Sequence, residues 1–354
     1  MKKLSVCILF GGVSPEHEVS LRSAESVLNN IDHSKYNVFP VGITKDGDWI
    51  HYTGKDYSLL PTGEWKDYPG NRRAAISPVR GQGLLSFEGD CVVRERIDVV
   101  FPVLHGENGE DGSIQGLMQV AGVPCVGPGV TASASCMDKT MTKLVVGETG
   151  VRQANWYLAR RQSIQEDLGR LVRDIESGGD YPLFVKPSGT GSSVGVSKVR
   201  NTQELKDALK KAAEFDEKVL VEEFISGHEV EVAVLGNKNP IASVVGEVIA
   251  GAEFYDYDAK YISTESRTEI PADISPDASE RLRKAAVTVY EALGCKGLSR
   301  VDFFLTYEGE EVVFNEINTI PGFTSISMYP KLFEAAGVPN DTLIDELISL
   351  AMEG

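Results

Sequence analysis

The hydrophobic and polar positions of this chain first predict an α/β unit. Residues 4–10 form a continuous apolar run that ends at Gly11-Gly12, and apolar residues then recur at helical spacing over 21–31. A second apolar run, 97–104, leads into a loop rich in glycine and acidic residues, and a helical stretch follows at 113–120. Strand–turn–helix order predicts an open sheet, and ligands bind such sheets at the carboxyl ends of their strands.

The rest of the pattern predicts strands and helices in mixed order. We expect strands at 181–185, 194–199, 218–224, 229–235, 298–306 and 311–318, and helices at 135–150, 201–212 and 275–294. Two segments depart from this regularity. Residues 45–96 are rich in turn formers, which predicts irregular hairpins without chemistry. Residues 250–268 are polar and tyrosine-rich, and a long loop of this kind is usually an active-site lid or disordered.

Composition and charge narrow the class of protein. The 354 residues allow two or three domains, and the hydrophobic content of 42% is ordinary for a soluble globular protein. The 35 basic and 52 acidic residues give a net charge of −17, which argues against nucleic acid or an anionic membrane as the main partner. No apolar run approaches the ~20 residues of a membrane span. The five scattered cysteines and the absence of a signal-peptide pattern predict a cytoplasmic protein, and the five dispersed histidines argue against zinc.

A glycine-rich segment, 187–195, separates two predicted strands and therefore forms the loop of a hairpin. Its backbone N–H groups can surround an anion, and Lys186 at its start adds a charge suited to phosphate. We interpret it as a flap over the phosphates of a nucleotide, with a surface hairpin and a chance lysine as the alternative. A P-loop is excluded because its lysine follows the last glycine and precedes a helix, and the glycine spacing excludes a dinucleotide fingerprint.

Two predicted strands near the C-terminus bring oxygen ligands together. Asp302 and Glu316 are equally far from Gly309 in the connecting turn, so a tight hairpin places them opposite each other. Asn318 is two residues from Glu316 and shares its face. Opposed carboxylates repel each other unless a cation lies between them, and this donor set suits Mg²⁺ completed by water or phosphate oxygens. The sequence therefore predicts a magnesium site.

Three further polar residues are candidates for binding. Glu16 and His105 follow the first two buried strands, at the sheet edge where ligands bind. The alternative for Glu16 is a favourable charge at the start of a helix, and for His105 a structural role. Glu222 lies inside an apolar strand, where a carboxylate needs a partner, so it is a candidate contact for a base or sugar; a solvated strand face is the alternative.

Taken together, the glycine flap with its lysine, the acidic strand and the Asp-Glu-x-Asn hairpin resemble the ATP-grasp superfamily. Over nearly its whole length the chain more closely resembles the D-alanine–D-alanine ligase family. The stretches that carry this resemblance are 11–20, 104–112, 137–139, 186–195, 255–261 and 315–327. Each stretch is modestly specific, but all six in this order are very specific. Residues 45–96 match the family least.

The resemblance implies an α/β fold class, with α+β character in the ATP-binding part. It implies a three-domain ATP-grasp fold: an N-terminal open α/β domain at 1–134, a central ATP-grasp subdomain with the flap at 135–226, and a C-terminal subdomain with the lid and the metal site at 227–354. ATP would be clasped between the second and third domains.

The resemblance also implies roles for residues in nucleotide and metal binding. The implied ATP contacts are Lys139, Lys186, Ser193, Glu222, Glu229 and Lys260. The implied ligands of two Mg²⁺ ions, for which Mn²⁺ is a possible substitute, are Asp302, Glu316 and Asn318. Glu223 stands where some members carry lysine, so the details of the adenine pocket stay open.

For the amino-acid substrates, the implied catalytic residues are Glu16, Ser192, Tyr261, Arg300 and Gly322. Glu16 would hold the ammonium group of the first D-alanine, and Arg300 and the Gly322 N–H would donate to an oxyanion. Further substrate contacts are implied for His105, Ser327 and Met328. We also expect the Tyr261 hydroxyl to reach Ser192 and Glu16, and the uncharged Tyr261 and Met328 to favour D-alanine over D-lactate at the second site.

The implied reaction joins two D-alanine molecules at the expense of ATP, through a D-alanyl phosphate, for peptidoglycan precursor synthesis. The resemblance also implies a homodimer. Another ATP-grasp ligase, of the D-Ala–D-Ser or D-Ala–D-lactate type, is the alternative enzyme. A nucleotide-binding regulator without turnover is disfavoured by the complete metal-ligand set, and a nicotinamide oxidoreductase by the missing fingerprint.

Overall fold

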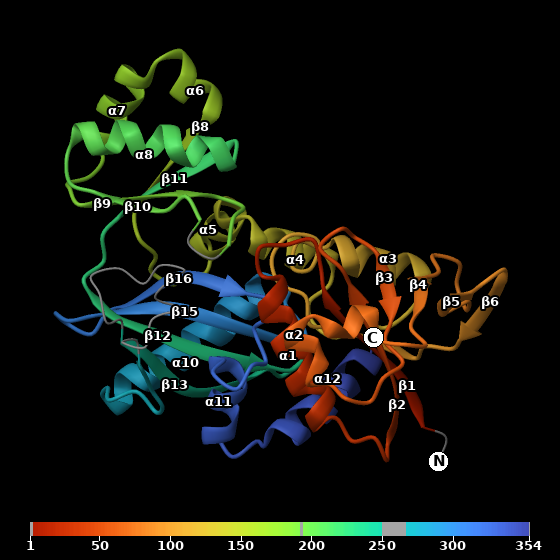
Figure 1. The fold of residues 1–354 in the computed structure, drawn as a ribbon. Helices are drawn as coiled ribbons and strands as arrows, with labels where there is room; N and C mark the ends of the chain where they lie inside the picture. Colours follow the sequence, from red (N-terminus) through yellow and green to blue (C-terminus); the bar gives the residue numbers. More distant parts are fainter. Residues whose placement is uncertain (1–2, 192–193, 250–266, 354) are drawn as a thin grey trace.

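The computed structural model describes residues 3–191, 194–249 and 267–353, which form three sheets flanked by helices (Figure 1). The α/β fold class predicted from the sequence is confirmed. The lid predicted at 250–268 falls almost entirely outside the described residues. None of the helices in the described part of the chain is both long and apolar enough to cross a membrane.

The first sheet is built around β1 (Leu4–Gly11), which pairs in parallel with β2 (Tyr36–Ile43) and β7 (Val99–Pro102). Helices α1 (His17–Asn30) and α3 (Ser113–Ala121) follow β1 and β7, as the apolar spacing predicts. The antiparallel strands of the predicted hairpin region extend the sheet, and two short helical turns lie between them: β3 (Trp49–His51), α2 (Leu59–Thr62), η1 (Glu64–Asp67), β4 (Arg72–Ile76), β5 (Leu84–Glu88) and β6 (Cys91–Glu95).

One predicted helix, 135–150, is wrong because the chain breaks it into two helices. In place of a single helix over 135–150, the chain forms α4 (Val130–Met137) and then α5 (Lys139–Gly147). The break lies at Asp138, whose backbone is extended and whose side chain accepts hydrogen bonds from the N–H groups of Thr140 and Met141. An aspartate that satisfies two N–H groups of the next turn acts as an N-cap, and an N-cap begins a new helix.

The second sheet has the order β10-β9-β11-β8 and carries the predicted flap hairpin. Its strands are β8 (Trp156–Arg160), β9 (Leu183–Pro187), β10 (Ser197–Val199) and β11 (Lys218–Glu223). Helices α6 (Arg161–Glu166), α7 (Leu168–Glu176) and α8 (Thr202–Phe215) pack on it and share its apolar core. The predicted cap of α8 is confirmed, because the Asn201 side chain accepts from the N–H groups of Gln203 and Glu204.

The third sheet has the order β14-β13-β12-β15-β16. Its strands are β12 (Gly227–Leu235), β13 (Ile241–Ile249), β14 (Arg267–Glu269), β15 (Leu298–Thr306) and β16 (Val312–Asn318), and its helices are α10 (Pro276–Ala292), α11 (Met328–Ala335) and α12 (Asn340–Met352). Asp302 lies opposite Glu316 in the β15–β16 register, as predicted from their positions about Gly309. Beneath one face, α10 completes an apolar core.

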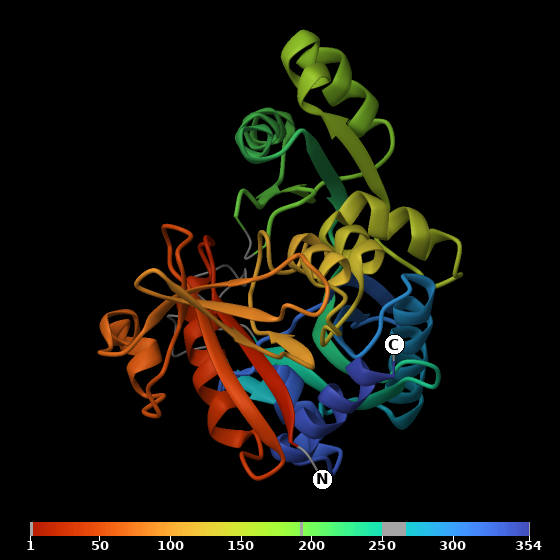
Figure 2. The same ribbon diagram turned by 90° about the vertical axis from the view of Figure 1, so that its right-hand side faces the viewer.

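The first and third sheets share one apolar core, whereas the second sheet has its own. The shared core joins Val6 of β1 and Leu28 of α1 to Tyr329 of α11 and Leu347 of α12. Figures 1 and 2 show the result: the second sheet and α6–α8 stand apart from the body formed by the other two sheets. The sheets change between β7 and β8 and between β11 and β12, which brackets the predicted boundaries at 134/135 and 226/227; the domain limits themselves stay a prediction.

Candidate active site

A cleft lies where the start of α1, the loop after β7, helix α5 and the ends of β15 and β16 approach one another. Nine of the residues predicted for the site line it: Glu16, His105, Lys139, Arg300, Glu316, Asn318, Gly322, Ser327 and Met328. These residues lie far apart in the sequence, from position 16 to position 328, so the fold brings most of the predicted site into one place.

A row of three carboxylates crosses the third sheet beside this cleft. Glu231 of β12 is paired with Asp302 of β15, which is paired with Glu316 of β16. Residues directly opposite each other on neighbouring antiparallel strands project from the same face, so the three negative charges are neighbours. Sequence reasoning identified Asp302 and Glu316 but missed Glu231, although its two-residue spacing from Glu229 placed it on that residue's face.

Arg300 offsets part of this charge. Its Nε and Nη2 atoms donate to the two oxygens of Asp302 at 2.8 and 2.7 Å, and Nε lies 2.8 Å from Glu231 Oε2. Burial alone would lower the pKa of Arg300, but Asp302 and Glu231 outweigh burial and raise it well above its ordinary value. Arg300 is therefore a permanent cation within the row.

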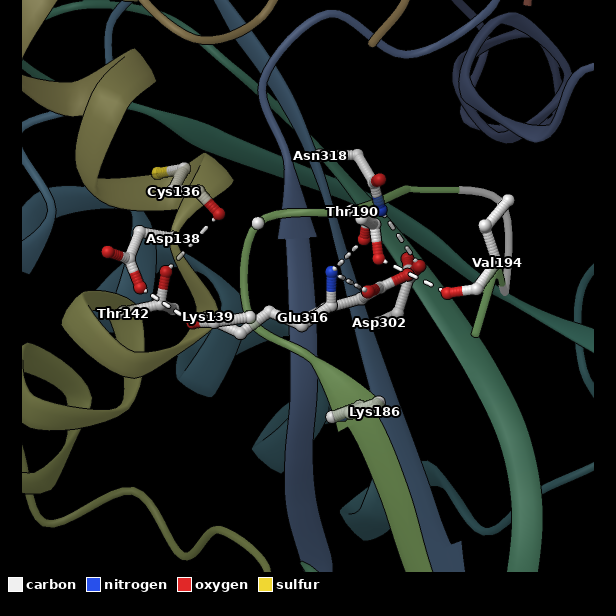
Figure 3. Close-up of polar contacts among 12 residues, drawn as sticks. Cys136, Asp138, Lys139, Thr142, Lys186, Thr190, Val194, Asp302, Glu316 and Asn318 are labelled. Carbon is white, nitrogen blue, oxygen red and sulfur yellow. Dashed lines mark hydrogen bonds and ion pairs between the residues drawn. The ribbon is translucent and has the colours of Figure 1, made fainter. Parts of the chain in front are cut away.

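Lys139 supplies the second cation from α5. Its Nζ lies 3.5 Å from Glu316 Oε2 and donates to the carbonyl oxygen of Thr190 in the flap at 2.9 Å (Figure 3). The lysine thus joins the acidic row of the third sheet to the flap of the second. A phosphate placed between flap and row would lie within reach of this ammonium group.

Asp138 fixes the position of Lys139. Besides capping α5, its carboxylate accepts a hydrogen bond from Ser188 Oγ at 2.7 Å and pairs with Lys218 of β11. The Lys139 N–H also donates to the Ser188 carbonyl at 3.0 Å. Helix α5 is therefore tied to the base of the flap at its first residue.

The residues proposed for two Mg²⁺ ions fit hard cations. Asp302 and Glu316 offer carboxylate oxygens and Asn318 an amide oxygen, and the Asn318 Nδ2 group donates to Asp302 Oδ2 at 3.0 Å. With Glu231 the row holds three carboxylates against two side-chain cations, which leaves an excess of negative charge. Within the described residues no group of three or more His, Cys, Asp or Glu side chains has metal-binding geometry by itself, so phosphate or water oxygens would have to complete the coordination.

A second charged cluster lies between α5 and the second sheet. Lys186 Nζ is 2.7 Å from Glu222 Oε2, and Lys143 Nζ is 2.9 Å from Glu222 Oε1. All three residues are buried. Burial alone would raise the pKa of Glu222, but Lys186 and Lys143 outweigh it and lower the pKa below its ordinary value. Glu222 is ionised and paired, so it does not belong to a solvated strand face.

At the other end of the cleft, Glu16 occupies the position before the first residue of α1. A side chain added at Gly191 of the flap would lie 3.5 Å from Glu16 Oε2, and one at Gly106 would lie 3.0 Å from it. The carboxylate therefore faces both the flap and the loop after β7. This position suits contact with a cationic group enclosed between the two.

The loop after β7 holds the turn that follows β16. His105 is buried, with Nδ1 at 3.1 Å from the Ile320 carbonyl and Nε2 at 3.3 Å from Ser23 Oγ. Glu110, which the sequence analysis did not single out, accepts from the N–H groups of Gly106 at 2.7 Å and Ile320 at 3.3 Å. Burial lowers the pKa of His105 and raises that of Glu110 to about 8, with the charge of Glu16 adding to the rise.

The turn after β16 is closely packed. A Cβ atom on Gly322 would lie 2.7 Å from Ser327 Oγ, so a larger residue would displace this serine at the wall of the cleft. Ser327 Oγ accepts from the Thr324 N–H at 3.0 Å, and Ser23 Oγ accepts from the Phe323 N–H at 3.2 Å. The turn is thereby held by both its own serine and a serine of α1.

Several predicted site residues lie elsewhere. Glu229 is exposed on β12 and does not line the cleft, while Lys186, Glu222 and Asp302 are connected to it through their ion pairs and hydrogen bonds. Ser192, Ser193, Lys260 and Tyr261 fall outside the described residues, so the expected contact of Tyr261 with Ser192 and Glu16 stays a prediction. Lys143 was missed because an isolated lysine in a helix gives no sign of burial.

Comparison with known proteins defines the class. A family model described as the D-ala D-ala ligase N-terminus matches residues 5–128, and one described as the D-ala D-ala ligase C-terminus matches residues 145–349. A D-alanine–D-alanine ligase from Acetivibrio thermocellus is 50% identical, with 99% of this chain and 96% of the relative covered. One from Clostridium novyi is 48% identical over 100% of this chain and 99% of the relative.

Solved structures agree with the sequence relatives. The VanG D-Ala:D-Ser ligase from Enterococcus faecalis superposes with a TM-score of 0.90 at 41% identity, covering 99% of this chain and 100% of that one. The D-alanine–D-alanine ligase from Coxiella burnetii gives 0.85 at 34% identity, covering 100% and 95%. The three sheets and the cleft between them are thus those of an ATP-grasp ligase fold. Within that class, the chain belongs to the D-alanine–D-alanine ligase family.

The raised pKa of Glu110 makes a prediction about stability. Its pKa is about 8 in the folded protein against an ordinary value of 4.5, so the folded state binds more protons than the unfolded state between these limits. This contribution to stability is fully present below about pH 4.5 and is lost as the pH rises through about 8. Glu110→Gln removes the titration, so its free energy of unfolding should fall less steeply with pH, by up to ~1.4 kcal/mol per pH unit.

Urea unfolding at several pH values between 5 and 8 measures this slope. Glu107→Gln, an exposed position in the same loop, is the matched control and should follow the wild-type slope. Equal slopes in all three proteins would contradict the assignment.

Proposed function

We propose that this chain ligates two D-alanine molecules to D-alanyl-D-alanine with the hydrolysis of ATP to ADP and phosphate, for peptidoglycan precursor synthesis. Membership of the D-alanine–D-alanine ligase family supports the reaction class. The observation that carries the proposal is the cleft itself, in which an acidic row, a lysine-bearing flap and Glu16 face one another. Phosphoryl transfer depends mainly on positioning and charge stabilisation, and this arrangement supplies both.

In this proposal the nucleotide lies between the flap and the third sheet. Lys139 and Lys186 contact its phosphates, together with Ser193 and Lys260, and Glu222 and Glu229 contact adenine and ribose. Asp302, Glu316 and Asn318 hold two Mg²⁺ ions, or Mn²⁺ in their place, which neutralise phosphate charge when bound. Lys139 lies 2.9 Å from the Thr190 carbonyl oxygen, so a small movement of its side chain moves a positive charge from flap to phosphate.

The amino-acid substrates bind at the other end of the cleft. Glu16 pairs with the ammonium group of the first D-alanine, whose carboxylate attacks the γ-phosphate to give an acyl phosphate and ADP. The amine of the second D-alanine then attacks the acyl carbon, and phosphate leaves. Arg300 and the Gly322 N–H donate to the tetrahedral oxyanion. His105, Ser327 and Met328 orient the substrates, while Ser192 and Tyr261 complete the catalytic set with Glu16.

Release of ADP with a panel of D- and L-amino acids tests the reaction. We expect turnover with D-alanine and none with L-amino acids, together with formation of the dipeptide. Glu316→Gln should reduce kcat by ~10³-fold or more. The substitution removes a carboxylate proposed to bind the Mg²⁺ ions, which stabilise the phosphate charge in the transition state. Glu308→Gln makes the same change at an exposed position of the β15–β16 turn and should leave turnover unchanged.

Circular dichroism establishes that Glu316→Gln keeps the wild-type fold. Near wild-type turnover of that variant at saturating Mg²⁺ would exclude the proposed role of Glu316. ADP release driven by a different amino acid, with none by D-alanine, would exclude the proposed substrate.

A second candidate acceptor is D-serine, since the matched VanG structure is a D-Ala:D-Ser ligase. D-lactate is the further alternative. We expect D-alanine to be preferred over D-lactate, because Met328 at the start of α11 and Tyr261 carry no positive charge at neutral pH that would oppose the ammonium form of D-alanine.

A competition assay decides between the acceptors. The enzyme receives equal concentrations of D-alanine, D-serine and D-lactate at pH 7, and the products are separated by mass. D-Alanyl-D-alanine should predominate. A majority of D-alanyl-D-serine or of the depsipeptide would reassign the second site, and Tyr261→Phe is expected to gain some depsipeptide.

The place and assembly of the enzyme are also proposed. The five cysteines form no disulfide, and the thiols of Cys136 and Cys295 lie at a hydrogen-bond distance of 3.7 Å, which supports a reducing, cytoplasmic compartment. A homodimer is expected from the family resemblance, and light scattering of the purified protein measures it.

A further inference from the structure

Lys143 is a buried lysine that the proposed mechanism does not use. It projects from α5, is 2% exposed and lines the wall of the cleft. Its Nζ lies 2.9 Å from Glu222 Oε1, while Lys186 of β9 holds the other oxygen, Oε2, at 2.7 Å. Two ammonium groups thus share one carboxylate inside the protein.

This cluster has one positive charge too many for a buried site. Burial lowers the pKa of Lys143, the charge of Glu222 opposes this, and the charge of Lys186 lowers the pKa further. Glu223, the next residue on β11, adds an attraction to Lys143 and itself lies 4.0 Å from Arg152. Like charges in a buried site repel strongly, so a phosphate that binds nearby would attract one of the two lysines away from Glu222. Lys186 borders the flap, so it is the lysine placed to leave.

The contact between Lys143 and Glu222 is a buried ion pair, with Nζ 2.9 Å from Oε1. Neither atom has a further hydrogen-bond partner among the described residues. Lys143 therefore stabilises the carboxylate as a point charge. Glu222 Oε1 keeps an unused capacity to accept a hydrogen bond, and a buried acceptor in this state favours a ligand that donates.

We propose that Lys143 is a positioning residue that sets purine selectivity: it keeps Glu222 ionised after Lys186 has moved to the phosphates. An ionised carboxylate accepts from the amino group of adenine and repels the carbonyl oxygen that guanine carries at the same ring position. Without Lys143, the buried Glu222 would lose its remaining cation and take up a proton. A carboxylic acid both donates and accepts, so it no longer distinguishes the two bases. This inference rests on the proposed contact between Glu222 and the base.

Lys143→Met tests the inference. The ratio of kcat/KM for ATP to that for GTP should fall by ~tenfold or more, mainly through a rise in the KM for ATP with kcat changed little. In this variant the KM for ATP should fall again as the pH rises from 6 to 9, because Glu222 then ionises, whereas the wild-type KM should stay flat over the same range. Lys143→Arg keeps the charge and should restore the preference for ATP.

Two further variants separate the possible failures. Glu222→Gln, which cannot ionise, should lower the ATP preference without pH dependence; an unchanged preference would overturn the base contact and with it this inference. The role of Lys143 would be overturned by a different pair of results: Glu222→Gln lowers the ATP preference as expected, but Lys143→Met keeps the selectivity and pH profile of the wild type. The proposed function would then stay intact. If Lys143→Met does not fold, the double variant Lys143→Met/Glu222→Gln removes the charges of this ion pair together. The affinities of the double variant for ATP and GTP, measured by calorimetry, must equal those of Glu222→Gln alone.

Discussion

Repulsion among the three carboxylates of Glu231, Asp302 and Glu316 is the constraint on which the rest of the structure depends. Neighbouring strands place them in one row, where like charges destabilise the sheet unless cations offset them. Arg300 of β15 lies within the row and pairs with Glu231, and Lys139 of α5 pairs with Glu316. Asp138 binds the start of α5 to Ser188 and Lys218 of the second sheet. The ion pair of Lys139 with Glu316 therefore also holds the second sheet against the third.

The cluster of Lys143, Glu222 and Lys186 has the opposite imbalance, with two cations and one anion. The acidic row is complementary to a cation, and the basic cluster beside it is complementary to a polyanion. Together they suit a ligand that contains both. A metal-bound nucleotide is such a ligand. The net charge of −17 therefore does not oppose nucleotide binding, because the local arrangement of charges rather than the total determines what the cleft attracts.

The sequence predicted those features that depend on local spacing. The opposition of Asp302 and Glu316 follows from their equal distance to Gly309, and the flap hairpin from glycines between two apolar runs. The spacing of Glu231 from Glu229 places both residues on one face of a strand, but its position beside Asp302 depends on long-range pairing of the whole sheet and could not be predicted. The helix break at Asp138 was missed for another reason: its cap competes with a helical pattern that continues on both sides.

His105 and Glu110 explain why the first sheet belongs to the site at all. Neither is needed to hold the acidic row, yet both bind the backbone of Ile320, two residues before Gly322. The shared core then locks β1 and α1 against α11 and α12, so the turn cannot shift without disturbing that core. In the proposed function the Gly322 N–H donates to an oxyanion, and such a donor has to be held within a fraction of an ångström. The N-terminal sheet supplies that rigidity, which a turn resting on the third sheet alone would lack.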